Sequence, residues 1–239
     1  MGMGDQQPQR RRKNASREST RQELLETARL LLAERGFDTA LSLRLTEVTK
    51  AAGLTTGAAY QLWAGGQADF HRELAEYLIE RDAGKGASSV ADRAAETLLE
   101  GRPLADVIES SASAYLDEQL NELGFAVLSH YWPAARTHPE LAGLVKDGYG
   151  RFHDSFTEIY AALIDHFGLE LQPGVTIDDL TVAMSAVADG FVLRAGVDPD
   201  RMTTVTLADD DGTPREWSLF AASLAAIVRA MTRPRSMNS

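Results

Sequence analysis

Cysteine is absent from the chain of 239 residues. Disulfide bonds, thiolate metal sites and cysteine nucleophiles are therefore excluded. Long hydrophobic runs are missing too, because Ser223 and Arg229 interrupt the longest apolar stretch, residues 220–231. The start of the chain is polar and basic, and no apolar segment follows it as in a signal peptide. We therefore expect a cytoplasmic protein that has no membrane partner.

Sequence motifs of the common enzyme classes are also missing. The chain has no nucleophile elbow, no phosphate-binding loop and no dinucleotide glycine fingerprint. Its five histidines lack the tight spacing of a metal site. We therefore expect no catalytic residue, no metal and no cofactor. A helical enzyme whose site is assembled from distant residues stays open as an alternative.

The net charge of −11 is unevenly distributed along the chain. Residues 1–72 hold 11 Lys and Arg against 8 Asp and Glu, whereas the remainder holds 13 against 27. The two parts are therefore expected to have different partners, with an anionic partner for the first. Most of its positive charge falls in residues 10–21, and residues 1–18 are too polar to pack alone. We expect a flexible basic arm that either clamps a phosphate backbone or is only a solvated tail.

Apolar periodicity predicts helices over residues 20–35, 44–52, 55–63 and 67–80. Thr20 and Glu23 fit a capping box at the start of the first helix. Gly53 suits a positive-φ turn between the second and third helices, and Thr55 can cap the third. This arrangement is typical of a helix-turn-helix unit, in which the third helix points outward as a reading element. We expect this domain to span residues 19–83, followed by a second domain over residues 84–239.

Several residues of this unit together resemble the N-terminal domain of TetR-type transcriptional regulators. They are Thr20-Arg-Gln-Glu-Leu-Leu25, Ala33-Glu-Arg-Gly-Phe37, Val48, Ala52-Gly-Leu-Thr55, Gly57, Ala58, Tyr60 and Trp63. The resemblance covers about residues 20–78 and implies a duplex DNA partner. It also implies that Tyr60 contacts phosphate and that Thr56 and Ala58 contact bases.

The sequence departs from the family pattern at three places. The link between residues 36 and 48 is about three residues longer, Arg44 replaces a Thr or Ser, and Gln67 replaces a phosphate-contacting lysine. The third helix also carries no positive charge, so electrostatic affinity must come from the arm, Arg44, Lys50 and Arg72.

Base recognition is assigned to the outer face of the third helix. On chemical grounds Gln61 can pair with adenine through its amide, and Ala58 can touch a thymine methyl group. A core position is the alternative for Tyr60, and Trp63 is expected to be core. The candidate DNA-binding residues are Arg44, Thr46, Lys50, Thr55, Thr56, Gly57, Ala58, Tyr60 and Gln61, with Arg10, Arg11, Arg12 and Lys13 of the arm.

The second half predicts further helices over residues 90–100, 103–122, 125–136, 139–167, 176–194 and 216–231, with a short extended piece at 203–207. In the resembled family this half forms the dimer and holds a small-molecule pocket. Candidate pocket residues, most of which are expected to be ordinary core, are Tyr115, Phe125, His130, Trp132, Tyr149, His153 and Phe156. Candidate dimer-interface residues, for which an intramolecular core is the alternative, are Leu180, Met184, Val187, Phe191, Phe220, Leu224 and Ile227.

The sequence therefore predicts an all-α protein: an N-terminal three-helix helix-turn-helix domain for DNA, joined by a connecting helix to a helical-bundle ligand-binding and dimerisation domain. We expect a bacterial, homodimeric DNA-binding regulator, a repressor that an unknown small-molecule effector releases from a palindromic operator. A helical adaptor that docks another protein without sensing a ligand is the main alternative.

Overall fold

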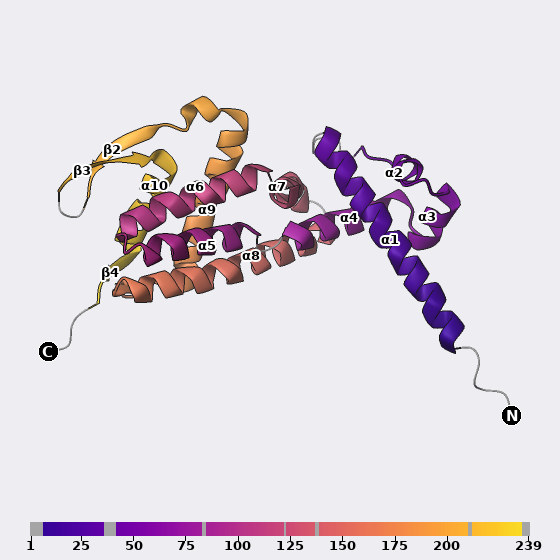
Figure 1. The fold of residues 1–239 in the computed structure, drawn as a ribbon, viewed down its shortest axis with the longest axis horizontal. Helices are drawn as coiled ribbons and strands as arrows, with labels where there is room; N and C mark the ends of the chain where they lie inside the picture. Colours follow the sequence, from indigo (N-terminus) through magenta and orange to yellow (C-terminus); the bar gives the residue numbers. More distant parts are fainter. Residues whose placement is uncertain are drawn as a thin grey trace. The chain divides into compact units, whose positions relative to one another are not determined.

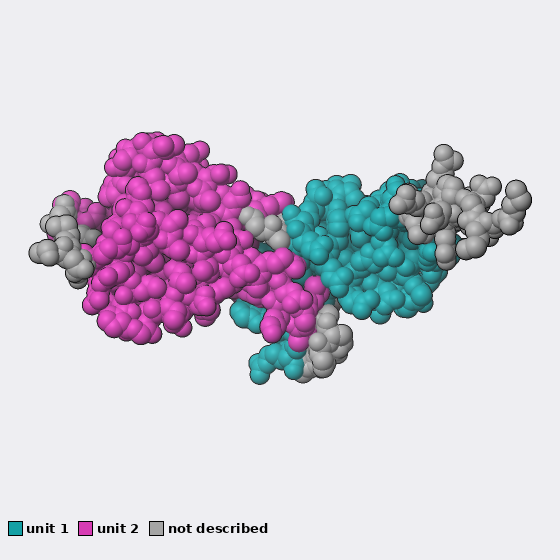
Figure 2. Space-filling view, turned by 90° about the horizontal axis from the view of Figure 1, so that it is seen from below, with its two compact units in different colours: residues 1–81, 123–137 teal, residues 82–122, 138–239 magenta. Residues whose placement is uncertain are grey.

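The computed structural model describes residues 7–35, 42–82, 85–121, 123–136, 139–209 and 212–235. These residues are predominantly helical, which confirms the all-α fold class (Figure 1). The chain forms two compact units, one of residues 1–81 and 123–137 and one of residues 82–122 and 138–239 (Figure 2). The first boundary lies close to the expected one, but the segment 123–137 returns to the first unit.

The first unit is built from five helices of the described chain. They are α1 (Gln7–Arg35), α2 (Leu45–Ala51), α3 (Thr56–Leu62), α4 (Gln67–Asp82) and α7 (Leu123–Ala135). Its core contains Leu24, Leu25 and Leu32 of α1, which are almost fully buried because they recur on one face of the helix. Gly53 lies between α2 and α3 with φ at +69°, as the sequence predicts. This backbone conformation favours glycine and allows the two short helices to turn sharply.

Helix α1 begins at Gln7 rather than at residue 20, so the expected start of this helix was wrong. The hydroxyl of Thr20 donates to the carbonyl oxygen of Ser16, 2.9 Å away, as in a helix interior. The expected capping box at Thr20 is therefore absent. Residues 9–13 are Gln, Arg and Lys, which lose little side-chain freedom in a helix, and Pro8 suits a first turn. The basic segment expected to be a flexible arm thus continues α1, which extends past the other helices of its unit (Figure 1).

The second unit is a bundle of helices with two small antiparallel sheets. The helices are α5 (Lys85–Leu99), α6 (Leu104–Asn121), α8 (Pro139–His166), α9 (Ile177–Val197), α10 (Leu219–Met231) and a 3₁₀ turn, η2 (Pro199–Arg201). The strands are β1 (Leu169–Leu171), β2 (Thr204–Ala208), β3 (Pro214–Ser218) and β4 (Thr232–Pro234). β1 pairs with β4, and β2 pairs with β3.

The β2–β3 hairpin lies between α9 and α10 in the chain. The expected extended piece at 203–207 is confirmed as β2, but residues 216–218 belong to β3, so α10 begins later than expected. Val205 pairs with Trp217, whose side chain is buried. The guanidinium group of Arg215 lies 4.9 Å from the Trp217 ring centroid and forms an ion pair with Asp106 of α6. The hairpin is thereby held against α6.

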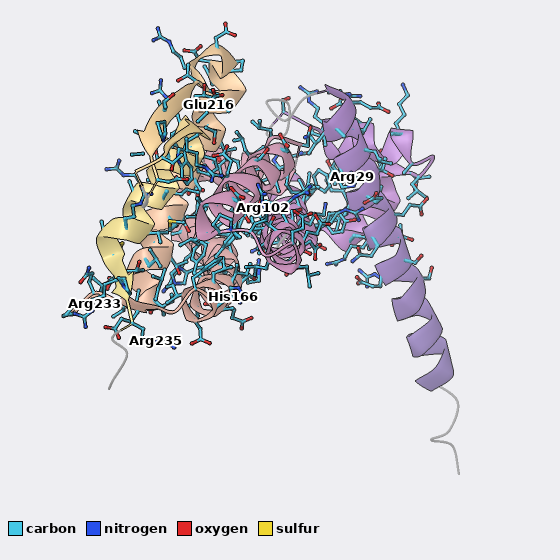
Figure 3. All side chains as sticks on the ribbon, turned by 60° about the vertical axis from the view of Figure 1, so that its left-hand side comes forward. Arg29, Arg102, His166, Glu216, Arg233 and Arg235 are labelled. Atoms are coloured by element: carbon cyan, nitrogen blue, oxygen red, sulfur yellow. The ribbon has the colours of Figure 1, made fainter. Side chains whose placement is uncertain are left out.

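The β1–β4 sheet joins the end of α8 to the end of the described chain. Arg233 pairs with Glu170 at 2.8 Å, and Arg235 pairs with Asp165 at 2.9 Å. Figure 3 shows the two arginines close together near the end of the described chain. Both pairs are exposed, so each contributes little stability.

Helix α9 begins with a capping box. The Thr176 hydroxyl accepts from the backbone N–H of Asp179 at 3.1 Å, and the Asp179 carboxylate accepts from the N–H of Thr176 at 2.9 Å. In the described chain, α9 is also the one helix long and apolar enough to cross a membrane on length and composition alone. Its Leu180, Met184 and Val192 are nevertheless buried within the unit. Here it serves as a core helix.

Candidate nucleic-acid interface and ligand cavity

Helix α3 has one buried face and one exposed face. Ala59 within the helix and Trp63 directly after it are buried. Tyr60 is 52% exposed. The core alternative for Tyr60 was therefore wrong, and Trp63 is a core residue as expected. The candidate reading residues that lie exposed are Thr55, Thr56, Gly57, Tyr60 and Gln61. The side chain of Ala58 lies outside what the structure describes.

The N-terminal end of α3 lacks the expected side-chain cap. Thr55 occupies the capping position, but its hydroxyl accepts no hydrogen bond from the first turn. Its exposed side chain is therefore available to an external partner. Helix α2 likewise exposes Arg44, Thr46 and Lys50, while its opposite face is buried.

The C-terminal end of α3 is held by two arginines of α1. Arg17 donates to the carbonyl oxygen of Gln61 at 2.6 Å, and Arg21 donates to that of Leu62 at 3.3 Å. Arg21 also donates to both carboxylate oxygens of Glu73 in α4, at 2.9 and 3.0 Å. Arg17, which the sequence places in the basic arm, thus joins Arg21 of the expected first helix in fixing the reading helix to the unit.

Glu73 joins three elements of this unit. Besides Arg21 of α1, it accepts a hydrogen bond of 2.7 Å from the indole Nε1 of Trp63, next to α3. Trp63 in turn packs edge to face with Phe70 of α4, with ring centroids 5.2 Å apart. One carboxylate of α4 is thus bonded both to the residue that follows α3 and to an arginine that holds the end of α3. No sequence motif marks Glu73, since its partners lie 10 and 52 residues away.

Gln67 has a structural role where the resembled family has a phosphate-contacting lysine. Its amide nitrogen donates to the carbonyl oxygen of Leu43 at 2.7 Å, and its amide oxygen accepts from the N–H of Leu45 at 2.9 Å. A lysine lacks an acceptor and could not make both bonds. Gln67 therefore ties α4 to the start of α2.

Few cations of the described residues face outward near α3. Arg72 lies 3.6 Å from Asp69, so part of its charge is neutralised within the protein. Arg44 and Lys50 are exposed and form no ion pair among the described residues. The side chains of Arg10, Arg11, Arg12 and Lys13 lie outside what the structure describes. Their backbone belongs to α1.

The second unit contains a cavity between α6, α8, α9 and α10. The centre of a water molecule could occupy a volume of about 80 Å³ inside this cavity. A single water needs much less on the same measure, so the cavity has room for a larger molecule. The lining residues are Val90, Leu104, Val107, Ile108, Ser111, Ala112, Tyr115, Phe152, Phe156, Tyr160, Leu163, Ile164, Leu169, Leu180, Met184, Ser185, Ala188, Phe220, Leu224 and Val228. None of them carries a formal charge.

Two buried hydroxyl groups of α6 belong to residues of the cavity wall. The Oγ of Ser111 and the hydroxyl of Tyr115 are buried and have no hydrogen-bond partner among the described residues. Burial, followed by the nearby charge of Asp189, raises the pKa of Tyr115 well above its usual value. The phenol therefore stays neutral and can donate.

The structure places the expected pocket residues in three groups. Tyr115 and Phe156 line the cavity, whereas Tyr149 and His153 of α8 do not. Phe125 and Trp132 lie on α7 in the other unit and are not among the residues that line this cavity. The side chain of His130 lies outside what the structure describes. The sequence did not distinguish Ser111 from other helical serines, because only the fold turns it inward.

Asp189 of α9 is a buried carboxylate next in the chain to Ala188 of the cavity wall. It is 4% exposed, and it accepts a hydrogen bond of 3.2 Å from the hydroxyl of Tyr149. Burial raises the pKa of Asp189 from 3.8 to about 6, more than the Tyr149 bond lowers it. The ionised form therefore destabilises the folded state at neutral pH.

Replacing Asp189 with asparagine should stabilise the protein at pH 7 by about 2 kcal/mol, because asparagine keeps an acceptor for Tyr149 without a buried charge. The folded carboxyl binds its proton more tightly than the unfolded one. Wild-type stability should therefore fall, relative to that of Asp189→Asn, as pH rises from about 4 to above 6. Urea unfolding of both proteins across this range measures the difference. A difference that does not vary with pH would refute the assignment.

The expected dimer interface is partly corrected by the structure. Leu180, Met184, Phe220 and Leu224 line the cavity inside the unit and are at most 8% exposed, so they are not available to a partner. Val187, Phe191 and Ile227 are half-buried. The exposed stripe of α9 is formed instead by Val182, Ala186, Gly190, Leu193 and Val197. Helical periodicity did not identify the inward face because both faces of α9 are apolar.

No group of three or more His, Asp or Glu side chains within the described ranges is arranged to hold a metal ion. Residues 105–208 match the family model of the C-terminal domain of BetI-type transcriptional repressors. None of the curated proteins matches the sequence of the chain.

Several solved structures share the fold of both units. A protein from Rhodococcus sp. RHA1 assigned as a transcriptional regulator is 16% identical, with a TM-score of 0.61 over 87% of this chain and 94% of its own. GusR of Salmonella enterica is 18% identical, with a TM-score of 0.55 over 88% and 94%. Thermus thermophilus FadR, a TetR family transcriptional repressor solved with lauroyl-CoA, is 16% identical, with a TM-score of 0.52 over 87% and 91%.

The family model covers residues 105–208 of the second unit, and the solved structures share the fold of a helix-turn-helix unit followed by a helical bundle. The Gly53 turn and the exposed Tyr60 fit this pattern. Residues 105–208 are thus similar to the C-terminal domain of BetI-type transcriptional repressors, and the chain shares its fold with a solved TetR family repressor.

Proposed function

We propose that the protein is a homodimeric repressor that reads a palindromic operator with α3 and is released when a small molecule enters the cavity of the second unit. The exposed polar face of α3, fixed from behind by Arg21 and Glu73, is the observation that carries the proposal. A rigidly held helix with outward polar side chains fits recognition of base edges in the major groove. Regulators of this family typically have no enzymatic activity. A bacterial repressor of this kind acts in the cytoplasm, where the chromosome lies.

Gln61 and Tyr60 should have different roles in DNA binding, Gln61 contacting a base and Tyr60 contacting a phosphate. The Gln61 side chain is exposed on the outer face, and an amide can pair with both exposed groups of adenine in the major groove. Tyr60 offers an exposed hydroxyl for a phosphate, a contact that carries no sequence information.

Gln61→Ala should therefore relax base preference at one position of each half-site, with an affinity loss of about 5- to 100-fold for the preferred sequence. Tyr60→Phe should weaken all sequences alike. A selection from random duplexes followed by titration of the enriched and scrambled sites measures both effects. An unchanged preference in Gln61→Ala would refute the assignment of this residue.

The basic residues 10–13 should supply much of the phosphate affinity, because α3 has no positive charge. Replacing all four with glutamine preserves helix propensity while it removes the charge. The slope of log affinity against log salt should then become shallower by up to about 0.9 per lost phosphate contact. Arg17 is left in place, because it holds the end of α3. An unchanged slope would show that the segment is a passive extension.

The dimer is proposed to form through the exposed stripe of α9 and the outer face of α10. Leu193 is 47% exposed and Val197 is 86% exposed, and Gly190 and Ala186 between them allow a partner helix to approach closely. Ala226 and Ala230 of α10 are exposed as well. A two-fold dimer predicts half-site centres about 34–36 Å apart, or a multiple of this distance.

Ligand control is proposed to act through the cavity. Thermus thermophilus FadR was solved with lauroyl-CoA, which shows that this fold can hold a ligand with an apolar chain. In this chain the cavity wall includes α8, α9 and α10, and the last two carry the proposed dimer face. A molecule that fits only one arrangement of these helices would shift the population towards it and away from DNA.

A further inference from the structure

The chemical character of the effector can be inferred from the cavity wall, provided that the proposed function holds. All lining residues are uncharged, and all but a few are hydrocarbon side chains. An ion that enters such a space loses its hydration without gaining a counter-charge, which is far more costly than burying a neutral polar group. The buried carboxylate of Asp189 is not among the lining residues, and it already accepts a hydrogen bond from Tyr149.

The wall nevertheless contains a polar point of attachment. Ser111 is 8% exposed and Tyr115 is 3% exposed, and both hydroxyls lack a partner among the described residues. The two residues are four apart in α6, so their side chains lie on the same face one turn apart. A buried hydroxyl without a hydrogen-bond partner destabilises the folded protein, and an acceptor on a bound ligand would remove this cost.

Tyr115 is held in a fixed orientation by its aromatic neighbours. Its ring packs edge to face with Phe156, with centroids 5.8 Å apart, and with Phe152 at 6.2 Å. Phe220 lies 6.2 Å away on another side. The direction of the hydroxyl is thus set before any ligand arrives, as in other sites where a few placed polar groups orient a ligand.

We propose that the effector is a neutral, slender, mainly hydrocarbon molecule with one oxygen function, such as an alcohol, ketone or ester, which accepts hydrogen bonds from Tyr115 and Ser111. Its hydrocarbon part lies among the apolar residues of α8, α9 and α10. Carboxylates and amines with the same chain are excluded by the cost of burying their charge.

The test compares three probes of equal chain length, n-octanol, octanoate and octylammonium, by calorimetric titration of the full chain at pH 7. Octanol should bind at least tenfold more tightly than either ion. Tyr115→Phe and Ser111→Ala should each weaken octanol binding about fivefold. Ser223→Ala is the matched control, because its hydroxyl is satisfied by the Leu219 carbonyl and lies outside the wall. It should leave the affinity unchanged.

A fold check accompanies these variants. Tyr115→Phe removes a buried hydroxyl that has no partner, so the ligand-free variant should melt at or above the wild-type temperature. Tighter binding of octanoate or octylammonium, or full octanol affinity in Tyr115→Phe, would overturn the proposal. Operator affinity is measured separately with and without octanol. Octanol binding that leaves DNA affinity unchanged contradicts the regulatory role alone, whereas operator binding by a protein that takes up none of the probes contradicts the effector class alone.

Discussion

Replacing Glu73 with alanine should lower operator affinity by about 100-fold or more, towards the non-specific level. The substitution removes the acceptor of the Trp63 indole N–H, which is then buried without a partner, and frees the Arg21 guanidinium that holds the carbonyl of Leu62. Helix α3 would lose its attachment to α4 although none of its own residues changed. The free energy of unfolding should fall by about 2 kcal/mol. Fluorescence anisotropy with labelled operator and urea unfolding measure the two effects.

Glu73→Gln is the matched control for this change. Its amide oxygen can still accept from Trp63, but it offers no charge to Arg21, so its losses should lie between those of the wild type and Glu73→Ala. The alanine variant should retain its ligand affinity, because Glu73 and the cavity belong to different units. Full operator affinity in Glu73→Ala would show that α3 is positioned without this carboxylate.

Leu193→Arg should convert the dimer to a monomer and reduce operator affinity by at least 100-fold. Leu193 lies in the middle of the exposed stripe of α9, between Gly190 and Val197, where two arginines related by a two-fold axis would repel each other and be desolvated. A monomer binds each half-site separately, so it lacks the higher affinity that a dimer obtains by binding both half-sites at once. Sedimentation at several concentrations gives the mass, and titration with full and half operators gives the affinity.

The contrast with the cavity face of the same helix makes this test specific. Met184→Ala, on the inner face, should lower stability by about 2–3 kcal/mol through a larger cavity while the mass stays that of a dimer. A dimeric Leu193→Arg protein would contradict the assignment of the interface, and the half-buried Ile227 of α10 would then be the next residue to test.

Local signals predicted the helices well because they depend on neighbouring residues. The Gly53 turn and the start of α4 at Gln67 both follow from residues within four positions of one another. Trp63 was expected in the core from its place on the helix, and it is buried there.

The rest depended on contacts between distant segments. The hydroxyls of Ser111 and Tyr115 become candidate ligand contacts only because α8, α9 and α10 enclose them in a cavity. No pattern of neighbouring residues predicts that these helices pack around them. Leu180 and Met184 share an apolar helix with Leu193, so periodicity alone could not tell the cavity face from the outer face. The replacement of a family lysine by Gln67 was visible in the sequence, but its role in holding α2 required the positions of Leu43 and Leu45.

These contacts explain two departures from the pattern of the resembled family, the glutamine at position 67 and the absence of positive charge from α3. Gln67 and the two arginines of α1 are engaged in fixing α2 and α3. The cationic phosphate contacts are consequently assigned to residues outside the reading helix, namely Arg44, Lys50 and the basic start of α1, while Tyr60 of α3 offers a neutral one. Sequence reading by uncharged side chains is thus separated from electrostatic attraction, and the two should respond differently to salt.

The central claim is tested most directly by incubating the purified protein and its Gln61→Ala variant with sheared DNA of the host genome at two salt concentrations and sequencing the retained fragments. A palindromic motif should persist at the higher salt with the wild type and lose its enrichment with the variant. Retention of no motif at either salt would contradict the central claim, and would favour a helical adaptor that binds protein rather than DNA.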